Sequence, residues 1–355
     1  MRHAAAGWSA EPKLERPDSL RVLMVTTEWE MPGLPRSGTF IKRQAEFVKR
    51  AGVELEVFTF DGQKNPYNYL RAWARLQHRL LTERFDLIHA QFGQSGLLAF
   101  PKRIPLVVTF RGSDALGIVR DSDGGYTRVG RLLQHASRFV ARHADAVIVV
   151  APHLGAQLGT KAPVHVIPSG IDFTEFTPIP QAQARQQLGL DGDDRLVLFV
   201  GRPGQARKRH ALARQAVELL NQRMPARLVV AWQVPHEQIP VYMSACDVLV
   251  FTSMQEGSPN VVKEALACDL PVVSVAVGDV PDRLRGVDGC EVCPDDEPKT
   301  IAAALERALA RGGRINGRAA VSHLDERLLT NQVLGVYRSV LAGRHVGISP
   351  AAEWA

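Results

Sequence analysis

The sequence predicts an α/β protein built from two doubly wound parallel-sheet domains, and three observations support this fold class. The chain of 355 residues is longer than one hydrophobic core usually supports. Short apolar runs alternate with amphipathic stretches along most of the chain, which is typical of βαβ units. The alternation stops at FTEFTPIPQAQ, residues 173–183, and then resumes. This interruption indicates a domain boundary.

The elements of the first domain follow from the alternation, because short apolar runs predict strands and longer amphipathic stretches predict helices. The apolar runs begin with LRVLMVTT, and the first amphipathic stretch is TFIKRQAEFVKRAG. We expect strands at 20–27, 53–60, 85–90, 105–110, 145–151 and 164–170, and helices at 39–52 and 126–144.

The second domain repeats this architecture without repeating its sequence. We expect strands at 195–201, 227–232, 247–253, 270–275 and 289–293, and helices at 210–222, 259–267 and 300–312. A last helix at 324–343 follows the second sheet and is expected to pack back across the boundary. We therefore predict an N-terminal domain of residues 1–176, a C-terminal domain of residues 177–324, and a returning C-terminal helix within residues 325–355.

The composition favours a soluble protein, since hydrophobic residues make up 45% and charged residues 23% of the chain. No apolar run approaches the roughly 18–20 residues of a membrane span, and the first residues lack the apolar core of a signal peptide. We expect a cytoplasmic protein, or one held peripherally at the inner face of the plasma membrane. Cys290 and Cys293 have the spacing of half a zinc site, but no second pair completes it, so we expect no metal.

The charge of the chain is concentrated in its first half, because residues 1–175 contain the whole formal net charge of +6. A one-sided basic surface attracts nucleic acid, anionic lipid or a phosphorylated substrate. The sequence contains no recognised nucleic-acid-binding motif. We therefore expect no nucleic-acid partner.

The stretch EGSPNVVKEALA, residues 256–267, predicts an anion-binding helix start. Ser258 is a good N-cap and Pro259 suits the first helical position, so the next backbone N–H groups face outward and attract an anion. Glu264 shares a helix face with Asn260, while Glu256 stays on the preceding loop. These acids are suited to accept hydrogen bonds from sugar hydroxyls. The alternative is an ordinary capped helix with solvated acids.

The stretch GRPGQARKRH, residues 201–210, predicts a group of cations at the same sheet edge. Arg202 directly follows a strand, and Lys208 precedes a helix. Ligands of doubly wound sheets lie beyond the carboxyl ends of the strands, where these cations offset a diphosphate charge. The alternative is a solvated basic turn.

A family resemblance extends over nearly the whole chain. It rests on VLMVTTEWEMPGLPRSGTFIKRQAE, DLIHAQF, VVTFRGSD, HVIPSGIDFTEFTP, VLFVGRPGQARK and ACDVLVFTSMQEGSPNVVKEALACDLPVVSVAVGD. The last stretch contains a glutamate, seven residues and a second glutamate. The chain resembles the retaining glycosyltransferase family 4, which implies a GT-B fold, in which two Rossmann-like domains face a central cleft. EGSPNVVKEALAC most resembles bacterial transferases of cell-surface polysaccharides, such as teichuronic acid or exopolysaccharide.

The resemblance implies roles for the candidate residues. Arg202 and Lys208 would hold the donor diphosphate, Glu264 the ribose, and Glu256 would lie near the sugar hydroxyls, so that Glu256, Arg202 and Lys208 form the catalytic set. The phosphate site would be lined by Gly257, Ser258, Asn260 and Val261. Such enzymes need no metal and no cofactor beyond the nucleotide sugar. The leaving diphosphate itself helps to deprotonate the acceptor hydroxyl, so we nominate no protein base.

Two positions depart from the family pattern. Arg111 stands where many relatives carry a histidine against the donor sugar, and an arginine donates hydrogen bonds but cannot shuttle a proton. We expect Arg111 to contact the donor, the alternative being a structural pairing with Asp114. The first glycine loop retains one glycine, Gly38, in Ser37-Gly38-Thr39, and we expect its backbone to approach the donor or acceptor. The donor base stays open.

The stretch LRAWARLQHRLLTERF, residues 70–85, suggests contact with an anionic membrane. Arginines 71, 75, 79 and 84 alternate there with Leu70, Trp73, Leu76, Leu80 and Leu81. The alternative is an ordinary surface helix with an apolar core face.

We expect a retaining glycosyltransferase that moves a sugar from a nucleotide diphosphate sugar to a saccharide or lipid-linked acceptor in surface polysaccharide assembly. Two other functions share the architecture, because fold alone does not assign function. One is a sugar-nucleotide epimerase, against which the glutamate pair argues. The other is an inactive nucleotide-sugar-binding partner protein.

Overall fold

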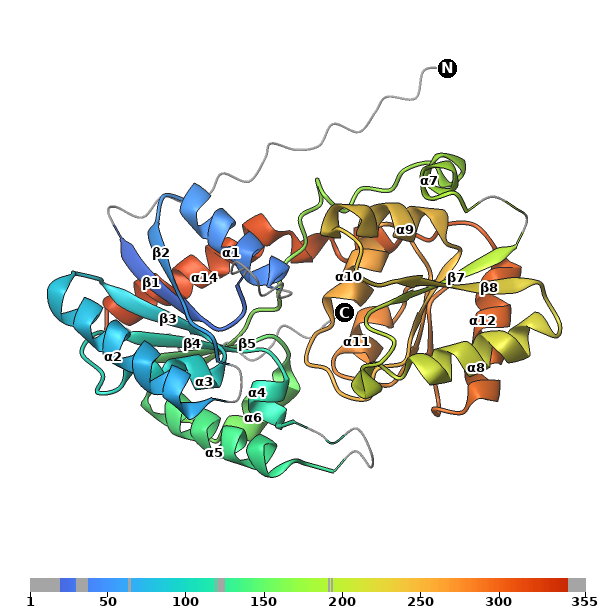
Figure 1. The fold of residues 1–355 in the computed structure, drawn as a ribbon. Coiled ribbons are helices and arrows are strands. Elements are labelled where there is room, and N and C mark those ends of the chain that lie inside the picture. Colours follow the sequence, from blue (N-terminus) through green and yellow to red (C-terminus); the bar gives the residue numbers. More distant parts are fainter. Residues whose placement is uncertain are drawn as a thin grey trace, which may run out of the picture.

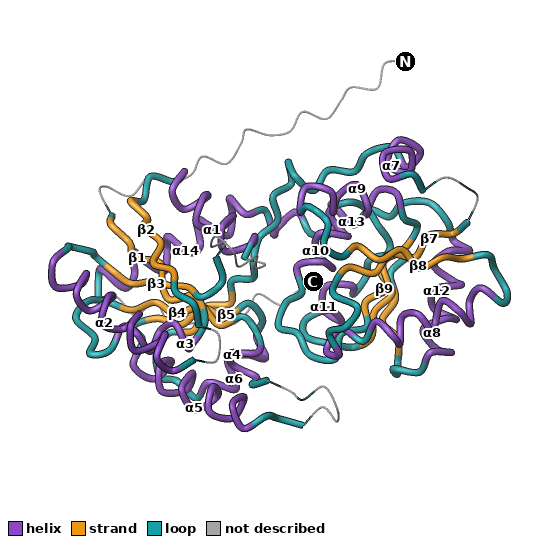
Figure 2. The backbone as a smooth tube through the Cα atoms, in the orientation of Figure 1, coloured by secondary structure: helices purple, strands orange, loops and turns teal. Residues whose placement is uncertain are grey.

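The computed structural model describes residues 20–29, 38–62, 65–118, 120, 125–190, 192 and 194–343. These residues form two α/β halves that lie side by side (Figure 1). Each half contains one parallel sheet with helices on both faces (Figure 2). The predicted fold class is confirmed, since every strand expected from the alternation of apolar runs is present in its expected half.

The N-terminal half contains a six-stranded sheet in the order β2-β1-β3-β4-β5-β6, and its central strands are fully buried because helices cover both faces. Its strands are β1 (Arg21–Thr26), β2 (Glu54–Thr59), β3 (Leu87–Gln91), β4 (Leu106–Phe110), β5 (Ala146–Val149) and β6 (Val164–Val166).

Two layers of helices enclose this sheet. One face carries α1 (Thr39–Arg50) and α14 (Glu326–Leu341), which pack against each other. The opposite face carries α2 (Pro66–Thr82), α3 (Gly93–Gly96), the 3₁₀ turn η1 (Leu97–Ala99), α4 (Ser113–Leu116), α5 (Arg128–His143) and α6 (Pro152–Leu158).

The C-terminal half contains a five-stranded sheet in the order β11-β10-β9-β7-β8. Its strands are β7 (Arg195–Val200), β8 (Ala226–Ala231), β9 (Val248–Phe251), β10 (Val272–Val275) and β11 (Glu291–Cys293). Its helices are α7 (Gln181–Leu188), α8 (His210–Asn221), α9 (Ile239–Ala245), α10 (Asn260–Ala267), α11 (Val280–Leu284), α12 (Pro298–Arg311) and α13 (Gly317–Ala320), with 3₁₀ turns η2 (Ala206–Lys208), η3 (His236–Gln238) and η4 (Ser322–Leu324).

The last helix, α14, joins the two halves. It leaves the C-terminal half and packs on the first sheet, where the Tyr337 hydroxyl lies 2.6 Å from Nδ1 of His89 on β3. Both side chains are fully buried. The strands of the first sheet precede residue 176 and those of the second follow residue 177, so we propose to keep the domain limits 1–176, 177–324 and 325–355.

The helix α2 differs in part from its expected role as a membrane-facing element. Leu76 is fully buried and Leu80 packs against the core. Arg79 pairs with Glu56 and Glu83. Leu76 and Leu80 therefore form an apolar core face, as in the alternative, while Leu70 and Leu81 are exposed, and membrane contact stays a prediction.

Candidate functional site

The candidate site lies where the strand order of the second sheet reverses. The chain runs from β7 outward to β8 on one side, and from β9 to β10 and β11 on the other. A doubly wound sheet binds its ligand beyond the carboxyl ends of the strands at this point. The two loops there are residues 201–209 after β7 and residues 252–259 after β9. These are the two loops that the sequence singles out.

The two loops meet through a buried acid. Glu256 lies 2.7 Å from the Lys208 ammonium and 2.7 Å from the Arg207 guanidinium, and its side chain is 13% exposed. Burial opposes its ionisation, but the two cations outweigh burial and lower the pKa of Glu256 below its usual value. The structure therefore brings together Glu256 and Lys208. It adds Arg207, which sequence reasoning missed although the residue lies in the same basic stretch.

Arg202, by contrast, points away from this cluster. Its side chain is exposed, and the guanidinium carbon lies 5.9 Å from the centre of the Trp232 ring beyond β8. Among the described residues, no hydrogen bond or ion pair joins Arg202 to Glu256 or Lys208, so the role of Arg202 at the diphosphate stays a prediction. The preceding Gly201 has a φ of 143°, which permits the chain to turn sharply at the end of β7. Of the predicted cation pair, only Lys208 reaches the acid.

The start of α10 differs by one residue from the prediction. The helix begins at Asn260, and Pro259 is the N-cap with an extended ψ of 121°. Ser258 therefore does not cap the helix, and the expectation of Ser258 as N-cap and Pro259 as first helical residue is wrong. Val261 packs its side chain against the core, so only the backbone N–H of this residue is available to a ligand.

Three buried polar atoms around this loop have no hydrogen-bond partner among the described residues. They are the hydroxyls of Ser253 and Ser258 and the Oδ1 atom of Asp279. Asp279 belongs to the site because its backbone N–H donates to the carbonyl of Gly257 over 3.1 Å. Buried polar atoms without partners are rare in folded proteins. Their gathering beside the loops after β7 and β9 suits a polar ligand rich in hydroxyl and phosphate oxygens.

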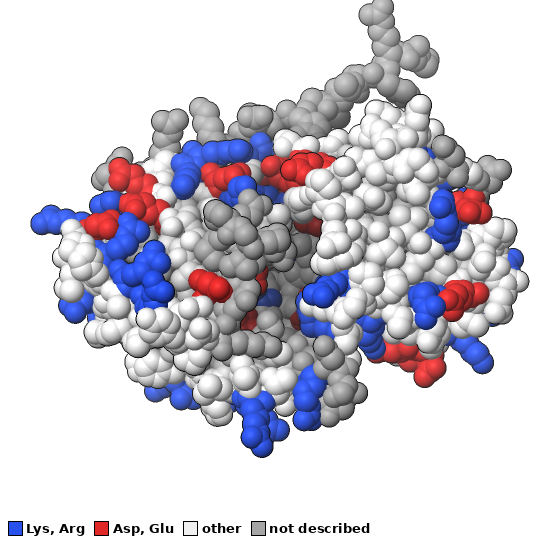
Figure 3. Space-filling view, viewed as in Figure 1, with Lys and Arg blue, Asp and Glu red and all other residues white. Residues whose placement is uncertain are grey.

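The N-terminal half forms the opposite wall of the site. A Cβ atom added to Gly257 would lie 2.4 Å from the carbonyl oxygen of Arg111, and one added to Gly112 would lie 3.3 Å from the amide nitrogen of Gly257. The loops after β4 and β9 therefore touch, so the carboxyl edges of the two sheets face each other. Figure 3 shows the surface hollowed between the two halves. Gly257 permits this close approach because it lacks a side chain.

The Arg111 side chain is held by neutral acceptors. Its guanidinium donates to the side-chain oxygens of Gln91 (2.6 Å), Gln44 (3.0 Å) and Ser169 (2.6 Å). Burial lowers the pKa of Arg111 to about 10. The Asp114 carboxylate accepts from the backbone N–H groups of Arg111, Gly112 and Gly93. Arg111 is thus tied to Asp114 through its backbone N–H, while no ion pair between its guanidinium and Asp114 is present among the described residues, and donor contact by Arg111 stays a prediction.

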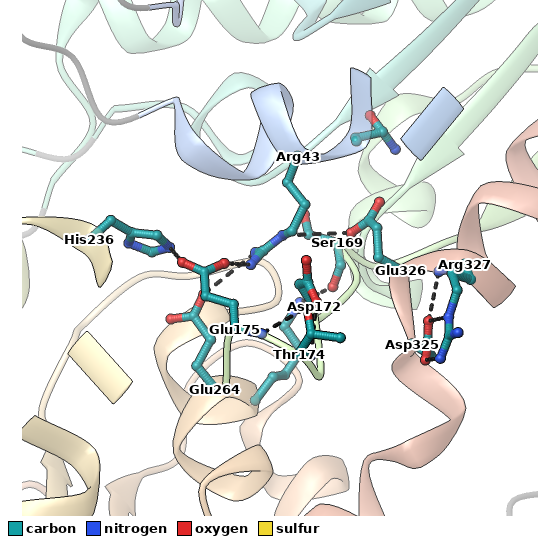
Figure 4. Close-up of polar contacts among 12 residues, drawn as sticks. Arg43, Ser169, Asp172, Thr174, Glu175, His236, Glu264, Asp325, Glu326 and Arg327 are labelled. Carbon is teal, nitrogen blue, oxygen red and sulfur yellow. Dashed lines mark hydrogen bonds and ion pairs between the residues drawn. The ribbon is translucent and has the colours of Figure 1, made fainter. Parts of the chain in front are cut away.

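Glu264 lies at the interface of the two halves, where it faces Arg43 on α1 (Figure 4). Nitrogen atoms of Arg43 lie 3.6 Å from Glu264, 3.5 Å from Glu175 and 3.8 Å from Glu326. His236 lies 3.4 Å from Glu175. We call these five residues the interface cluster. Both Arg43 and Glu264 are buried, so the second glutamate of the motif is paired across the interface.

A buried lysine adds a second link between the halves. The Lys263 ammonium donates to the Ser169 carbonyl over 2.7 Å and is 1% exposed. Burial lowers the pKa of Lys263 to about 7 and raises the pKa of Glu326 to about 7. Sequence reasoning missed Arg43, Lys263 and Glu326, and no local pattern marks them, because their partners come from distant segments.

The structure gives a reason for glycine at position 38 that the sequence did not reveal. It precedes α1, and a Cβ atom added to it would lie 2.5 Å from the carbonyl oxygen of Glu28. The backbone that approaches Gly38 is therefore that of the loop after β1. The neighbouring Ser37 lies outside the described residues.

Two facing parallel-sheet halves, with the candidate site between their carboxyl edges, are the GT-B fold. The family model described as Glycosyltransferase Family 4 matches residues 21–175, and that described as Glycosyl transferases group 1 matches residues 230–311. The N-terminal half of the chain is therefore similar to glycosyltransferase family 4, and part of the C-terminal half is similar to the group 1 glycosyl transferases.

Two similar proteins are named as glycosyltransferases. A D-inositol 3-phosphate glycosyltransferase of Mycolicibacterium gilvum is 31% identical over 67% of this chain and 62% of its own length. The putative teichuronic acid biosynthesis glycosyltransferase TuaC of Bacillus subtilis is 30% identical over 55% of this chain and 54% of its own length. The chain thus spans less than two thirds of these relatives.

Solved structures share the fold over most of the chain. Sucrose-phosphate synthase of Thermosynechococcus elongatus has a TM-score of 0.75 at 22% identity, covering 91% of this chain and 100% of its own. HepE of Anabaena, in complex with UDP and glucose, has a TM-score of 0.67 at 18% identity, covering 90% and 100%. Among the described residues, no helix combines the length and the apolarity that crossing a bilayer requires.

Proposed function

We propose that the protein transfers a sugar, with retention of anomeric configuration, from a nucleotide diphosphate sugar to a saccharide or lipid-linked acceptor in surface polysaccharide assembly. The observation that carries the proposal is the pairing of Lys208 and Arg207 with Glu256 beside the start of α10. A diphosphate bound there meets two cations and the N–H groups of a helix start, which together stabilise developing negative charge.

In the proposed reaction the donor C1–O bond to the diphosphate breaks, and a bond forms between C1 and the acceptor hydroxyl oxygen. The hydroxyl proton passes to an oxygen of the leaving diphosphate, so a nucleoside diphosphate and the glycosylated acceptor result. Lys208 and Arg207 hold the departing charge without a metal ion. Glu256 accepts from sugar hydroxyls, and Asp279 offers its unpaired Oδ1 for the same purpose. Glu264 accepts from the ribose.

The relatives guide the choice of substrates. The complex of HepE with UDP and glucose makes UDP-glucose the first donor to test. The teichuronic acid relative supports an acceptor of the surface polysaccharide class. The inositol 3-phosphate relative and the basic first half of the chain support an acceptor that carries phosphate.

The test is a panel of nucleotide sugars with the purified chain, with and without saccharide, phosphorylated and lipid-linked acceptors, read by mass spectrometry. We expect one donor to lose its sugar to an acceptor in the presence of EDTA, and NMR of the product to give the anomeric configuration of the donor. Glu264→Ala should weaken donor binding by roughly 1–3 kcal/mol in calorimetry through lost hydrogen bonds.

Each alternative function predicts a different result. Interconversion of the free donor without an acceptor would indicate an epimerase. Donor binding with neither transfer nor interconversion would indicate a binding partner protein. Inversion of the anomeric centre would contradict the retaining mechanism, and unaltered donor affinity of the Glu264→Ala variant would contradict the role of that residue.

A further inference from the structure

The outer surface of the N-terminal half carries most of the large apolar side chains that the described residues expose. They lie on α2, on α5 and in the segment that enters α5, and comprise Tyr67, Leu70, Trp73, Leu81, Ile118, Tyr126, Val129, Leu132 and Phe139. Gatherings of this kind mark interaction surfaces more often than scattered apolar residues do.

The two helices form one continuous surface, because Phe100 joins them. The Trp73 indole on α2 donates to the carbonyl of Phe100 over 2.7 Å. The Phe100 ring in turn lies 5.1 Å, centre to centre, from the ring of Phe139 on α5. Both helices cover the same face of the sheet. We call the outward side of α2, Phe100 and α5 the α2–α5 surface.

The charges on this surface are of one sign. Neither α2 nor α5 contains an Asp or Glu. The buried side of α5 is formed by residues such as Ser137 and Val140, and helical spacing places Arg128, Leu132 and Phe139 on the opposite side. Among the described residues, Arg128 and Arg131 have no ion-pair partner. Figure 3 shows Lys and Arg, but no Asp or Glu, along the lower edge of the N-terminal half, where α5 lies in Figure 1.

We propose that the α2–α5 surface docks this enzyme on an anionic lipid bilayer. Apolar and aromatic side chains at the level of the headgroups, flanked by arginines, are the features by which a helix lies in a membrane interface. Each arginine near the surface adds attraction to anionic lipid. The proposal extends the expected membrane contact of residues 70–85 to α5. The sequence predicted α5 only as a helix, but it contributes Arg128 and Arg131, which have no ion-pair partner among the described residues.

A lipid surface fits these observations better than a second protein does. A protein partner would have to supply acidic groups to at least two unpaired arginines and an apolar groove for Leu132, whereas an anionic bilayer offers both along a plane. The proposal does not depend on the chemistry proposed above. A chain without transferase activity would still bind lipid, and a soluble acceptor would still be glycosylated.

The test is flotation of the full chain with vesicles of phosphatidylcholine alone or of phosphatidylcholine with 30% phosphatidylglycerol. We expect binding only to the anionic vesicles, and release by 0.5 M NaCl. The double variant Arg128→Glu/Arg131→Glu should reduce the partition coefficient at least about tenfold, and Leu132→Ser should also reduce it. The matched control is Arg214→Glu/Arg223→Glu, whose side chains on the C-terminal half are 59% and 57% exposed.

Three results would overturn the proposal. One is no flotation with anionic vesicles. Another is an equal loss in the matched control, which would show attraction by net charge alone. The third is a dimer in light scattering that Leu132→Ser dissociates, which would show that a second copy covers the surface. Transfer to a water-soluble acceptor should be unchanged in the Arg128→Glu/Arg131→Glu variant, so a failure here is distinguishable from a failure of the proposed activity.

Discussion

The two glutamates of the stretch EGSPNVVKEALA are eight positions apart, yet they are held in different ways. Glu256 finds its cations, Lys208 and Arg207, within its own half of the molecule. Glu264 meets Arg43, which belongs to the other half. The first pairing is complete in one domain, whereas the second exists only when the two halves are in contact.

We propose that this difference gives the two glutamates separate roles. A charge arrangement built by neighbouring loops of one sheet is preorganised, which is what stabilisation of a leaving group requires. A pairing across an interface responds to the relative position of the domains, so that a ligand which competes for Glu264 changes the contact between them. Substitution of one partner at a time separates the two pairings.

The largest effect is expected from Lys208→Ala. The variant removes a cation from the leaving group and leaves Glu256 paired only with Arg207, so kcat should fall about 10²- to 10³-fold with little change in the unfolding midpoint. Steady-state kinetics with the donor found by the panel provide the measurement. The control is Lys299→Ala, an exposed lysine of the same half. Equal kcat in the two variants would rule out a role for Lys208 in charge stabilisation.

The next effect is expected from Arg43→Met, which breaks the cross-interface pairing alone. Three acidic residues of the interface cluster then lose their shared cation, and leaving buried charges without a partner costs about 3–5 kcal/mol. Urea unfolding measures the loss. Lys49→Met on the exposed side of α1 serves as the control and should change stability by under about 0.5 kcal/mol. A similarly small loss for Arg43→Met would mean that the cluster adds little to cohesion of the halves.

The contributions of Glu326 and Glu256 to the stability of the fold are expected to change with pH in opposite directions. Burial raises the pKa of Glu326 from 4.5 to about 7, despite the opposing charges of Arg43, Arg111 and Lys263. The folded state therefore binds a proton that the unfolded state has lost, and the contribution of Glu326 to stability decreases as the pH rises from 4.5 to 7. The pKa of Glu256 is lowered, so its contribution is retained above its usual pKa and is lost on acidification.

Glu326→Gln tests this sign, since glutamine imitates the protonated acid and does not titrate. Relative to the unmodified chain, the variant should gain up to about 1.4 kcal/mol per pH unit between pH 5 and pH 6.5, measured by urea unfolding at each pH. The exposed Glu46 on α1 offers the control substitution Glu46→Gln, which should leave the pH dependence unchanged. A parallel pH dependence of Glu326→Gln and the unmodified chain would show that Glu326 is ionised throughout.

The smallest effect on stability is expected from Ser258→Ala. An N-cap serine would cost about 1 kcal/mol on removal, but the Ser258 hydroxyl has no partner among the described residues. We therefore expect a change below about 0.5 kcal/mol in unfolding, together with an affinity for UDP weakened by about 1 kcal/mol in calorimetry. A loss of about 1 kcal/mol in the free energy of unfolding, with an unchanged affinity for UDP, would show that the Ser258 hydroxyl caps the helix and does not contact the ligand.

The sequence was sufficient to predict the sheets and the two loops of the site. Alternating apolar runs depend on which face of a strand or helix is buried, a property that each segment carries in itself. The placement of Lys208 and Glu256 at one edge follows, because parallel strands all end at that edge. The start of α10 was one residue off, because Pro259 adopts an extended conformation where its helical preference was assumed.

Only the tertiary structure determined which distant residues the side chains contact. The Lys263 ammonium donates to the carbonyl of Ser169, 94 residues away in the chain. Arg43 lies beside three glutamates that belong to separate segments of the chain. Gly257 is required by a carbonyl of the opposite half, and Gly38 by the loop after β1. Local sequence specifies elements because propensity and burial act over a few residues. The pairing of charges across an interface depends on the packing of whole domains, and no spacing in the sequence encodes that distance.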